Sequence, residues 1–337
     1  MTSPLIAEAK QYGLDLTDAL RAVEARLEAS FADDESLVTL VTGHLNHAGG
    51  KRFRPVVSLL SSMVGGMEPT HPDAIDGAVL VELTHQSTLY HDDVMDNAPT
   101  RRNQPSAHEQ WSNTVAILAG DWLLARASLM ASTLDARVVP ELARCVASLA
   151  RGQIREVVTS AHANTHQVPA LTPSVERYLS AIEGKTASLV ASSAAIGGMV
   201  SGLDDEAVAC LRQFGYHTGM AFQIADDVID ITADTEVSGK TPGTDLREGV
   251  RTLPVLFAIQ TDGLDSDLAR WVDDPTQEHV ALAVDYLRAH PAIEQARALA
   301  FDHIDRAGVA LGSLVGGRED IIDALMAMAA KAVDRIA

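Results

Sequence analysis

The chain has 337 residues, of which 47% are hydrophobic and only 4% aromatic, and its formal net charge is −20. So acidic a chain is repelled by nucleic-acid phosphates, which argues against nucleic-acid binding and against an electropositive membrane-binding surface. The length allows one large domain or two ordinary ones, and abundant Ala, Leu and Val with few aromatics favour packed helices over β-sandwiches.

Apolar residues recur at helical spacing along most of the chain, and Gly and Pro mark the breaks. The first expected helix starts at Pro4 and runs to about residue 29, with an interruption near Gly13. Further helices are expected over residues 34–48, 55–64, 73–96, 114–133, 138–162, 174–182, 185–199 and 204–231, and one opens at 252–254. Four or five shorter amphipathic helices should follow from about residue 264. No run alternates like a β-strand, so we expect a single all-α domain over residues 1–337.

Three polar stretches connect these helices, at residues 97–106, 163–173 and 233–250, and the last is rich in glycine. The N-terminus is unlike a signal peptide, and no apolar run looks long enough to cross a bilayer, so we expect a cytoplasmic protein. Cys145 and Cys210 lie in apolar helical stretches, which indicates buried thiols rather than a disulfide framework or a zinc site.

Two acidic clusters with the same spacing follow apolar helical runs. Asp92, Asp93 and Asp96 form the first, at positions i, i+1 and i+4, and the second has the same form. On a helix, i and i+4 project to the same side, so the carboxylates would repel one another unless cations lay between them. Hard oxygen ligands suit Mg²⁺, which completes its shell with waters and substrate phosphates.

The second cluster is formed by Asp226, Asp227 and Asp230. One such cluster is explained about equally well by a solvated acidic helix end. Two matching clusters, each on an apolar helix, favour a metal clamp for a diphosphate if the two helices face each other.

Basic residues are scarce and stand near these clusters or near glycines. Lys51 and Arg54 follow Gly49-Gly50 at a helix entrance, where free N–H groups can receive an anion. The other basic residues of interest are Arg101, Arg102, Lys185 and Lys240. Each alone is best explained as a surface charge. Together with two metal clusters, they indicate one diphosphate bridged by metal to aspartates and another held directly by Lys and Arg.

The sequence resembles the trans-isoprenyl diphosphate synthases, and bacterial polyprenyl diphosphate synthases in particular. The resemblance covers nearly the whole chain. It rests on Gly-Gly-Lys-Arg-Phe-Arg-Pro at 49–55, Asp-Asp-Val-Met-Asp at 92–96, Glu-Gly-Lys-Thr at 183–186 and Phe-Gln-Ile-Ala-Asp-Asp-Val-Ile-Asp at 222–230. It implies a bundle of helices around a central active-site cavity, and a homodimer. It also implies head-to-tail condensation of isopentenyl diphosphate with an allylic diphosphate, assisted by Mg²⁺, with three ions when substrate is bound.

The resemblance also implies the roles of individual residues. Asp92, Asp96 and Asp226 would bind Mg²⁺, supported by Asp93, Asp227 and Asp230. The allylic diphosphate would be held by Arg101, Lys185 and Lys240, and isopentenyl diphosphate by Lys51, Arg54, His85 and Arg102. Thr186 and Gln223 would line the reacting centre. Without the resemblance, His85 would be read as a core histidine.

One position departs from the family pattern. Members usually carry Lys where this chain has Val250, and the neighbouring Arg251 should point elsewhere on a helix. Val250 cannot bind phosphate, so we expect weaker loop closure over the allylic diphosphate without loss of activity.

Product length follows from the residues before Asp92. In the family, bulky aromatics four or five positions before this aspartate stop chain growth, but here the residues are Thr88 and Ser87, with Thr84 one turn further. All three are small, so we expect a polyprenyl product longer than twenty carbons. The alternatives are a farnesyl or geranylgeranyl diphosphate synthase and, less favoured, a non-catalytic prenyl-binding subunit.

Overall fold

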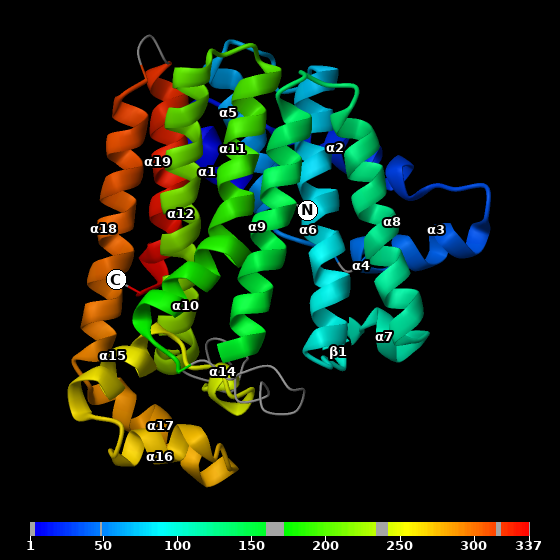
Figure 1. Ribbon diagram of the computed structural model, residues 1–337. Helices are drawn as coiled ribbons and strands as arrows, with labels where there is room; N and C mark the ends of the chain where they lie inside the picture. The colour runs from blue at the N-terminus through cyan, green and yellow to red at the C-terminus, as the bar shows by residue number, and fades with distance from the viewer. Residues whose placement is uncertain (1–3, 48, 160–171, 234–241, 315–317, 337) are drawn as a thin grey trace. The chain divides into compact units, whose positions relative to one another are not determined.

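The computed structural model describes residues 4–47, 49–159, 172–233, 242–314 and 318–336 (Figure 1). Helices dominate, as predicted. The α-helices are α1 (Pro4–Gln11), α2 (Thr17–Phe31), α3 (Ser36–Thr42), α4 (His44–His47), α5 (Phe53–Val64), α6 (Pro72–Met95), α7 (Ala107–Gln110), α8 (Asn113–Ala131), α9 (Val138–Thr159), α10 (Val175–Ile182), α11 (Ser188–Val200), α12 (Asp205–Thr232), α14 (Thr244–Arg247), α15 (Leu253–Asp262), α16 (Asp267–Asp273), α17 (Gln277–Ala289), α18 (Ala292–Gly312) and α19 (Glu319–Val333). The remaining elements are the strands β1 (Thr100–Arg101) and β2 (Gln104–Pro105), the π-helix η2 (Glu183–Ala187) and the 3-10 helix η3 (Asp334–Ile336).

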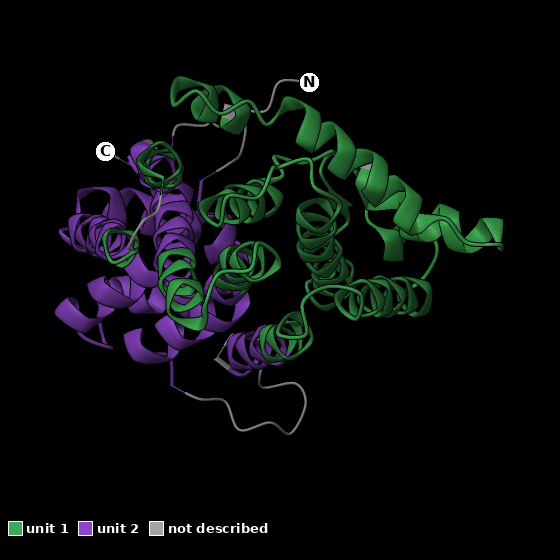
Figure 2. Ribbon diagram, turned by 90° about the horizontal axis from the view of Figure 1, so that it is seen from above, with its two compact units in different colours: residues 1–146, 189–215, 310–328 green, residues 147–188, 216–309, 329–337 purple. Residues whose placement is uncertain are grey.

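The chain divides into two compact units (Figure 2). Unit 1 comprises residues 1–146, 189–215 and 310–328, and unit 2 comprises residues 147–188, 216–309 and 329–337. Each unit draws on segments far apart in the sequence, and helices such as α9 and α12 contribute residues to both. The single-domain prediction stays a prediction.

Helix α6 is the centre of unit 1 and packs against α2, α5 and α8. Its start is defined locally, because Pro72 fixes the first turn and the His71 ring accepts a hydrogen bond from the backbone N–H of Asp73. Gly120 of α8 leaves room for the His91 ring of α6, which would have to shift if a Cβ were present there. The first acidic cluster at the end of α6 is therefore carried by a helix that is packed on several sides.

The loop before α5 is held by Arg52, which adopts a left-handed backbone conformation with φ of 53°. Its buried guanidinium donates to both oxygens of Glu24 at 2.6 and 2.9 Å, to Glu82 at 2.6 Å and to Asn46 at 2.7 Å. Charge-assisted bonds of this kind offset the cost of the strained backbone and of burying the charge. They fix the turn that follows Gly49 and Gly50.

In unit 2, backbones approach closely at two glycines. A Cβ on Gly152 of α9 would lie 2.4 Å from the backbone nitrogen of Lys185, and one on Gly184 would lie 2.6 Å from the carbonyl of Ser148. Only glycine permits this contact. It holds α9 against η2, the single π-helical turn that carries Lys185 and Thr186. Such turns recur at functional sites.

Several local details differ from the sequence-based expectation. The polar stretch 97–106 contains the two-stranded hairpin β1–β2, whose four residues are too few to show alternation. A new helix was expected to start at Lys185, but this residue belongs to a π-helical turn that continues α10. Gly184 does not end the helix, because it packs against Gly152. In the C-terminal part, α18 is long, with 21 residues, where shorter helices were expected.

Among the described residues, α8 is long and apolar enough to span a membrane by length and composition, and 39% of its apolar window is buried. This differs from the sequence-based expectation that every apolar run is too short. The charged residues Asp121 and Arg126 lie within this helix.

Candidate active site

The first acidic cluster in unit 1 separates into two kinds of aspartate. Asp92 is half-buried and Asp96 is exposed, and they lie one turn apart at the end of α6. Asp93 is fully buried, and its Oδ1 accepts two hydrogen bonds from Arg101, from Nε at 2.7 Å and from Nη2 at 2.6 Å. Burial raises the pKa of Asp93, whereas the Arg101 guanidinium opposes that rise. Asp92 and Asp96 are thus placed to bind a cation, and Asp93 anchors Arg101.

Arg101 and Arg102 are presented by the hairpin. Arg101 belongs to β1, and Arg102 and Asn103 form the two-residue turn with φ of 53° and 63°. Two successive positive φ values are typical of the tight turns that connect antiparallel strands. This turn points the two arginines to different partners: Arg101 binds Asp93, and Arg102 Nη1 donates to the carbonyl of Gly49.

Arg54 and Arg102 lie with His85 beside this glycine loop, and the three are called the cationic cluster because of the two guanidinium groups. A Cβ on Gly50 would lie 3.1 to 3.3 Å from the Arg102 guanidinium, so glycine leaves room for it. The Nε of Arg54 is buried and has no hydrogen-bond partner among the described residues. Burial followed by the charge of Arg54 and Arg102 lowers the pKa of His85 well below its usual value, so its imidazole is neutral at pH 7.

Burial also lowers the pKa of Arg54 and of Arg102, with Glu82 opposing the shift in both. Two guanidinium groups that are desolvated and near each other form a site that an anion would stabilise. The structure thus brings Arg54, His85 and Arg102 together. Lys51 lies on the same loop and is exposed.

The second acidic cluster, in unit 2, shows the same separation. Asp226 is half-buried, whereas Asp227 is 1% exposed. Asp227 accepts from the hydroxyl of Tyr178 at Oδ2 and from Gln223 Nε2 at Oδ1, the latter at 3.2 Å. Burial and the charge of Asp245 raise the pKa of Asp227 well above its usual range. The carboxylate of Asp230 accepts from the backbone N–H groups of residues 244 and 245 at 3.1 and 3.2 Å, and so fixes the start of α14.

Near this cluster, η2 presents Lys185 and Thr186. Lys185 Nζ forms an ion pair with Glu156 of α9, and Thr186 Oγ1 donates to Gln223 Oε1 at 2.9 Å. Burial, followed by the charge of Asp230, raises the pKa of Asp245 to about 7. Lys185, Thr186 and Gln223 therefore lie with Asp227 in one unit.

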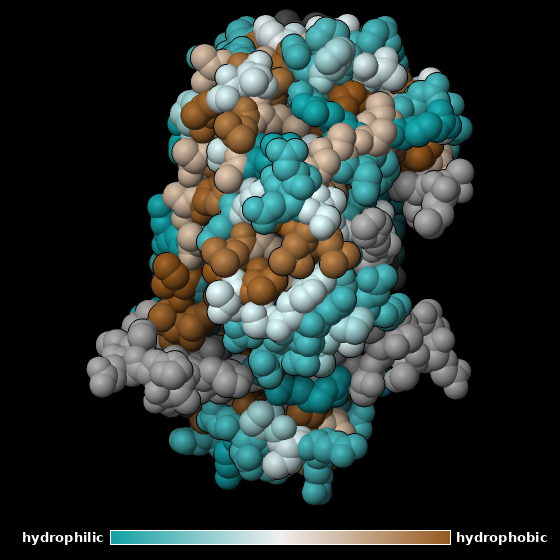
Figure 3. All heavy atoms as spheres, turned by 90° about the vertical axis from the view of Figure 1, so that its right-hand side faces the viewer, coloured by the Kyte–Doolittle hydropathy of each residue, from teal (hydrophilic) through white to brown (hydrophobic). Residues whose placement is uncertain are grey.

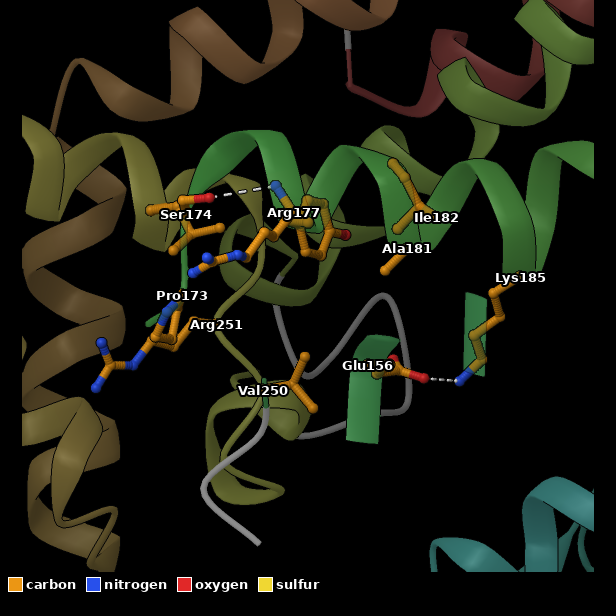
Figure 4. A pocket seen from close by; sticks show the side chains of 11 residues that line it. Glu156, Pro173, Ser174, Arg177, Ala181, Ile182, Lys185, Val250 and Arg251 are labelled. Carbon is orange, nitrogen blue, oxygen red and sulfur yellow. Dashed lines mark hydrogen bonds and ion pairs between the residues drawn. The ribbon is translucent and has the colours of Figure 1, made fainter. Parts of the chain in front are cut away.

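A cavity of about 30 Å³ in unit 2 is lined by Tyr178, Lys185, Glu156 and Val250. In Figure 4, Val250 points toward the Glu156–Lys185 pair, and Arg251 points away from it. Arg251 pairs instead with Asp273 of α16. The cavity wall therefore has an apolar side chain where the family pattern has an ammonium group.

Among the described residues, no group of three or more His, Cys, Asp or Glu side chains is close enough to hold a metal ion. Mg²⁺ rarely uses a cage built from protein alone, and takes one or two carboxylates together with waters and substrate phosphates. The half-buried Asp92 and Asp226 suit that mode. Lys240 lies outside the described residues.

Two residues at these sites were not predicted from the sequence. Tyr178 and Glu156 make the bonds to Asp227 and Lys185. Tyr178 stands seven residues before Lys185, two helical turns away on a regular helix, which is the one signal that could have indicated it. Glu156 had none, because the glycine contact that brings it near Lys185 is tertiary.

The sequence profile of the polyprenyl synthetase family matches residues 35–287. The chain belongs to this family. It is 42% identical over 299 residues to nonaprenyl diphosphate synthase of Mycobacterium tuberculosis, covering 85% of this chain and 86% of that one. It is 33% identical to heptaprenyl diphosphate synthase component 2 of Bacillus subtilis, and the match covers 90% of this chain and 84% of that protein. A decaprenyl diphosphate synthase from Rhodobacter capsulatus has a similar structure, with a TM-score of 0.86 and 30% sequence identity. The match covers 99% of this chain and 100% of that one.

These similarities confirm three sequence-based predictions: the trans-isoprenyl diphosphate synthase family, the all-α fold and an enzyme of the prenyltransferase class. The family is generally Mg²⁺-dependent and acts on isopentenyl and allylic diphosphates.

Proposed function

We propose that this enzyme condenses isopentenyl diphosphate repeatedly with an allylic diphosphate and makes an all-trans polyprenyl diphosphate longer than twenty carbons. The observation that carries the proposal is the cationic cluster of Arg54, His85 and Arg102. It encloses a guanidinium nitrogen of Arg54 that lacks a hydrogen-bond partner among the described residues. A buried arginine donor beside a glycine loop is suited to phosphate oxygens. We assign isopentenyl diphosphate to this cluster, with Lys51 at its edge.

The allylic diphosphate is assigned to the acidic clusters and to Lys185, with Arg101 and Lys240 as further cations. Asp92, Asp96 and Asp226 hold Mg²⁺ in this proposal, and we expect three ions when substrate is bound. Bound Mg²⁺ supplies Lewis-acid stabilisation of the departing diphosphate. Lys185 must then exchange its partner Glu156 for a phosphate oxygen, which it can do because the pair is partly exposed.

The reaction begins with ionisation of the allylic C–O bond, and the π electrons of isopentenyl diphosphate then attack the allylic cation. Loss of a proton, which the released diphosphate can accept, restores a double bond. Thr186 and Gln223 present a hydroxyl and an amide dipole to the developing charge, and such preoriented dipoles stabilise it without reorganisation. The apolar helices around the centre exclude water, which would quench the cation.

Product length rests on the small side chains before Asp92. Ser87 and Thr84 are 2% and 1% exposed, whereas Thr88 is partly exposed, so Thr88 is the one of the three that a growing tail can touch without repacking. The hydroxyl of Thr88 donates to the carbonyl of His85 at 2.8 Å, which leaves its methyl group to face an apolar tail. This arrangement supports continued elongation.

Two other functions remain as alternatives. A short-chain synthase would share the same site and differ only in where elongation stops. A subunit that needs a second chain is suggested by the name of the relative called component 2. The half-buried aspartates of both clusters favour a catalytic chain in either case.

We also propose a homodimer formed through α3 and α8 of unit 1. Apolar side chains gather on the face seen in Figure 3, and exposed ones on these helices are Leu37, Leu40, Ile117, Leu118 and Leu129. Asp121 and Arg126 make α8 costly to place in a bilayer, and Arg126 lies over the Trp122 ring at 5.2 Å. A protein partner therefore suits this face better than lipid, and a second copy is the simplest one.

Product analysis tests the function. The protein is incubated with Mg²⁺, isopentenyl diphosphate and, separately, dimethylallyl, geranyl, farnesyl and geranylgeranyl diphosphates, and chain lengths are read by mass spectrometry. Products of thirty or more carbons are expected. Products of fifteen or twenty carbons would favour the short-chain alternative. No condensation with any primer would contradict an independent catalyst, and adding a cell extract from the source organism would then test for a second subunit.

A further inference from the structure

A chain of three hydrogen bonds crosses unit 2 and ends at the proposed reacting centre. The Tyr178 hydroxyl donates to Asp227, Gln223 donates from Nε2 to the other oxygen of Asp227 at 3.2 Å, and Thr186 donates to Gln223 Oε1 at 2.9 Å. Asp227 is 1% exposed, so water does not compete for its oxygens. Each residue comes from a different turn: Tyr178 from α10, Thr186 from η2 and the other two from α12.

The direction of this chain is set by the carboxylate. Both oxygens of Asp227 accept hydrogen bonds here, one from Tyr178 and one from Gln223, and an amide has a donor end and an acceptor end. Asp227 therefore turns the NH₂ group of Gln223 toward itself and the carbonyl oxygen toward Thr186. The negative end of the amide dipole then lies at Thr186, on the side where a positive charge is to be stabilised.

Asp227 can impose this direction only if its own orientation is fixed. Both of its oxygens are occupied by donors, one from Gln223 and one from Tyr178. Without the tyrosine hydroxyl, one buried oxygen would lose its partner, and the carboxylate would rotate to recover a donor. The amide of Gln223 would then no longer be held in one orientation.

We infer that Tyr178 is a positioning residue, which fixes Asp227 and through it the orientation of Gln223 and Thr186 at the reacting centre. The inference rests on the proposed function. It assigns Asp227 to an internal scaffold, in contrast to the metal-supporting role expected from the sequence. Tyr178 itself acts at a distance and does not need to contact the reacting atoms.

Unit 2 also offers a matched control. Tyr286 of α17 donates to Asp262 at 2.9 Å, but this bond lies at an exposed position outside the chain described above. Replacing Tyr286 by Phe removes the same type of hydrogen bond and the same atom. A difference between the two variants therefore reports the place of the bond rather than the loss of a tyrosine hydroxyl.

The experiment compares wild type, Y178F, D227N, the Y178F/D227N double variant and Y286F in steady-state assays with isopentenyl and farnesyl diphosphates. Loss of a hydrogen bond to a buried carboxylate predicts a fall in kcat of about ten- to hundredfold for Y178F. The KM values and the Mg²⁺ concentration for half-maximal activity should stay within about twofold. In the D227N background, adding Y178F should lower kcat less than about threefold, since the residue that Tyr178 orients is already changed.

Several results would overturn the inference. These are an unchanged kcat in Y178F, an equal loss in Y286F, a multiplicative loss in the double variant, or a defect confined to KM. If Y178F does not fold by circular dichroism, 3-fluorotyrosine at position 178 replaces it, and a kcat equal to that of wild type then counts against the inference. Wild type that fails to condense any primer would instead contradict the proposed function.

Discussion

Replacing Arg54 by Met should weaken isopentenyl diphosphate binding without destabilising the fold. Met has an unbranched, apolar side chain of comparable length, so the space stays largely filled while the guanidinium is removed. The guanidinium is desolvated, lies near Arg102, and has a buried Nε without a partner among the described residues. A buried charge with incomplete partners contributes little to stability, so its removal should leave the melting temperature unchanged or raise it.

The loss in binding can be estimated from the bonds that Arg54 would make to phosphate. A hydrogen bond involving a charged group contributes about 1.5 to 3 kcal/mol, which corresponds to a factor of about 10 to 150 in affinity. The KM for isopentenyl diphosphate should therefore rise by about that factor. The KM for farnesyl diphosphate should change less than about threefold, because that substrate is assigned to the aspartates and Lys185.

A binding assay without turnover gives a second measurement. A ligand at 100 times its dissociation constant stabilises the folded state by about 2.7 kcal/mol, so inorganic pyrophosphate without metal should raise the melting temperature of wild type. The rise should be much smaller in R54M and unchanged in R21M, whose arginine is exposed on α2 and pairs with Asp18. Equal KM increases for both substrates, or an unchanged pyrophosphate response in R54M, would refute the assignment of this cluster.

Four further predictions follow from the same geometry. D226N should raise the Mg²⁺ concentration for half-maximal activity at least about tenfold, measured by metal titration, because it removes a carboxylate that we assign to the metal. T88F should shorten the main product detected by mass spectrometry, since an aromatic ring then faces the growing tail. V250K should lower the KM for the allylic substrate by placing an ammonium group in the cavity of Figure 4. Unchanged kinetics would contradict the expectation that Val250 weakens closure of the loop over the allylic diphosphate. Burial and the adjacent His217 lower the pKa of His303 to about 4, so below pH 6.5 the unfolded state binds more protons than the folded state. The free energy of unfolding should therefore fall by up to about 3 kcal/mol as the pH is lowered from 6.5 to 4. In thermal melts, H303F should make this fall smaller.

The helical fold could be predicted well from the sequence because helices are local. The break at Gly13 and the helix start at residues 252–254 depend on backbone preferences of single residues, and both are present in the structure. The π-helical turn η2 was not predictable in the same way. It depends on Gly184 meeting Gly152 from another helix, and neither glycine signals its partner in the sequence.

The candidate site could be predicted where its residues belong to the family's sequence motifs. The family motifs assign Arg54, His85 and Arg102 to the same diphosphate, and the three residues do lie together around the glycine loop. The partners of these groups were not predictable. Glu156 reaches Lys185, and Tyr178 reaches Asp227, through packing of helices that are distant in sequence or changed in pitch.

The aspartates of the two acidic clusters, spaced at i, i+1 and i+4, are not equivalent to one another. Successive helical residues are turned by about 100°, so when the first aspartate is directed to the surface the second is turned toward the interior. In both clusters this second aspartate is buried and accepts hydrogen bonds from protein donors: Asp93 from Arg101, and Asp227 from Tyr178 and Gln223. The first aspartate of each cluster is half-buried, and it is the one that we assign to the metal. Each cluster therefore combines an aspartate that we assign to the metal with a buried aspartate that accepts hydrogen bonds from neighbouring side chains.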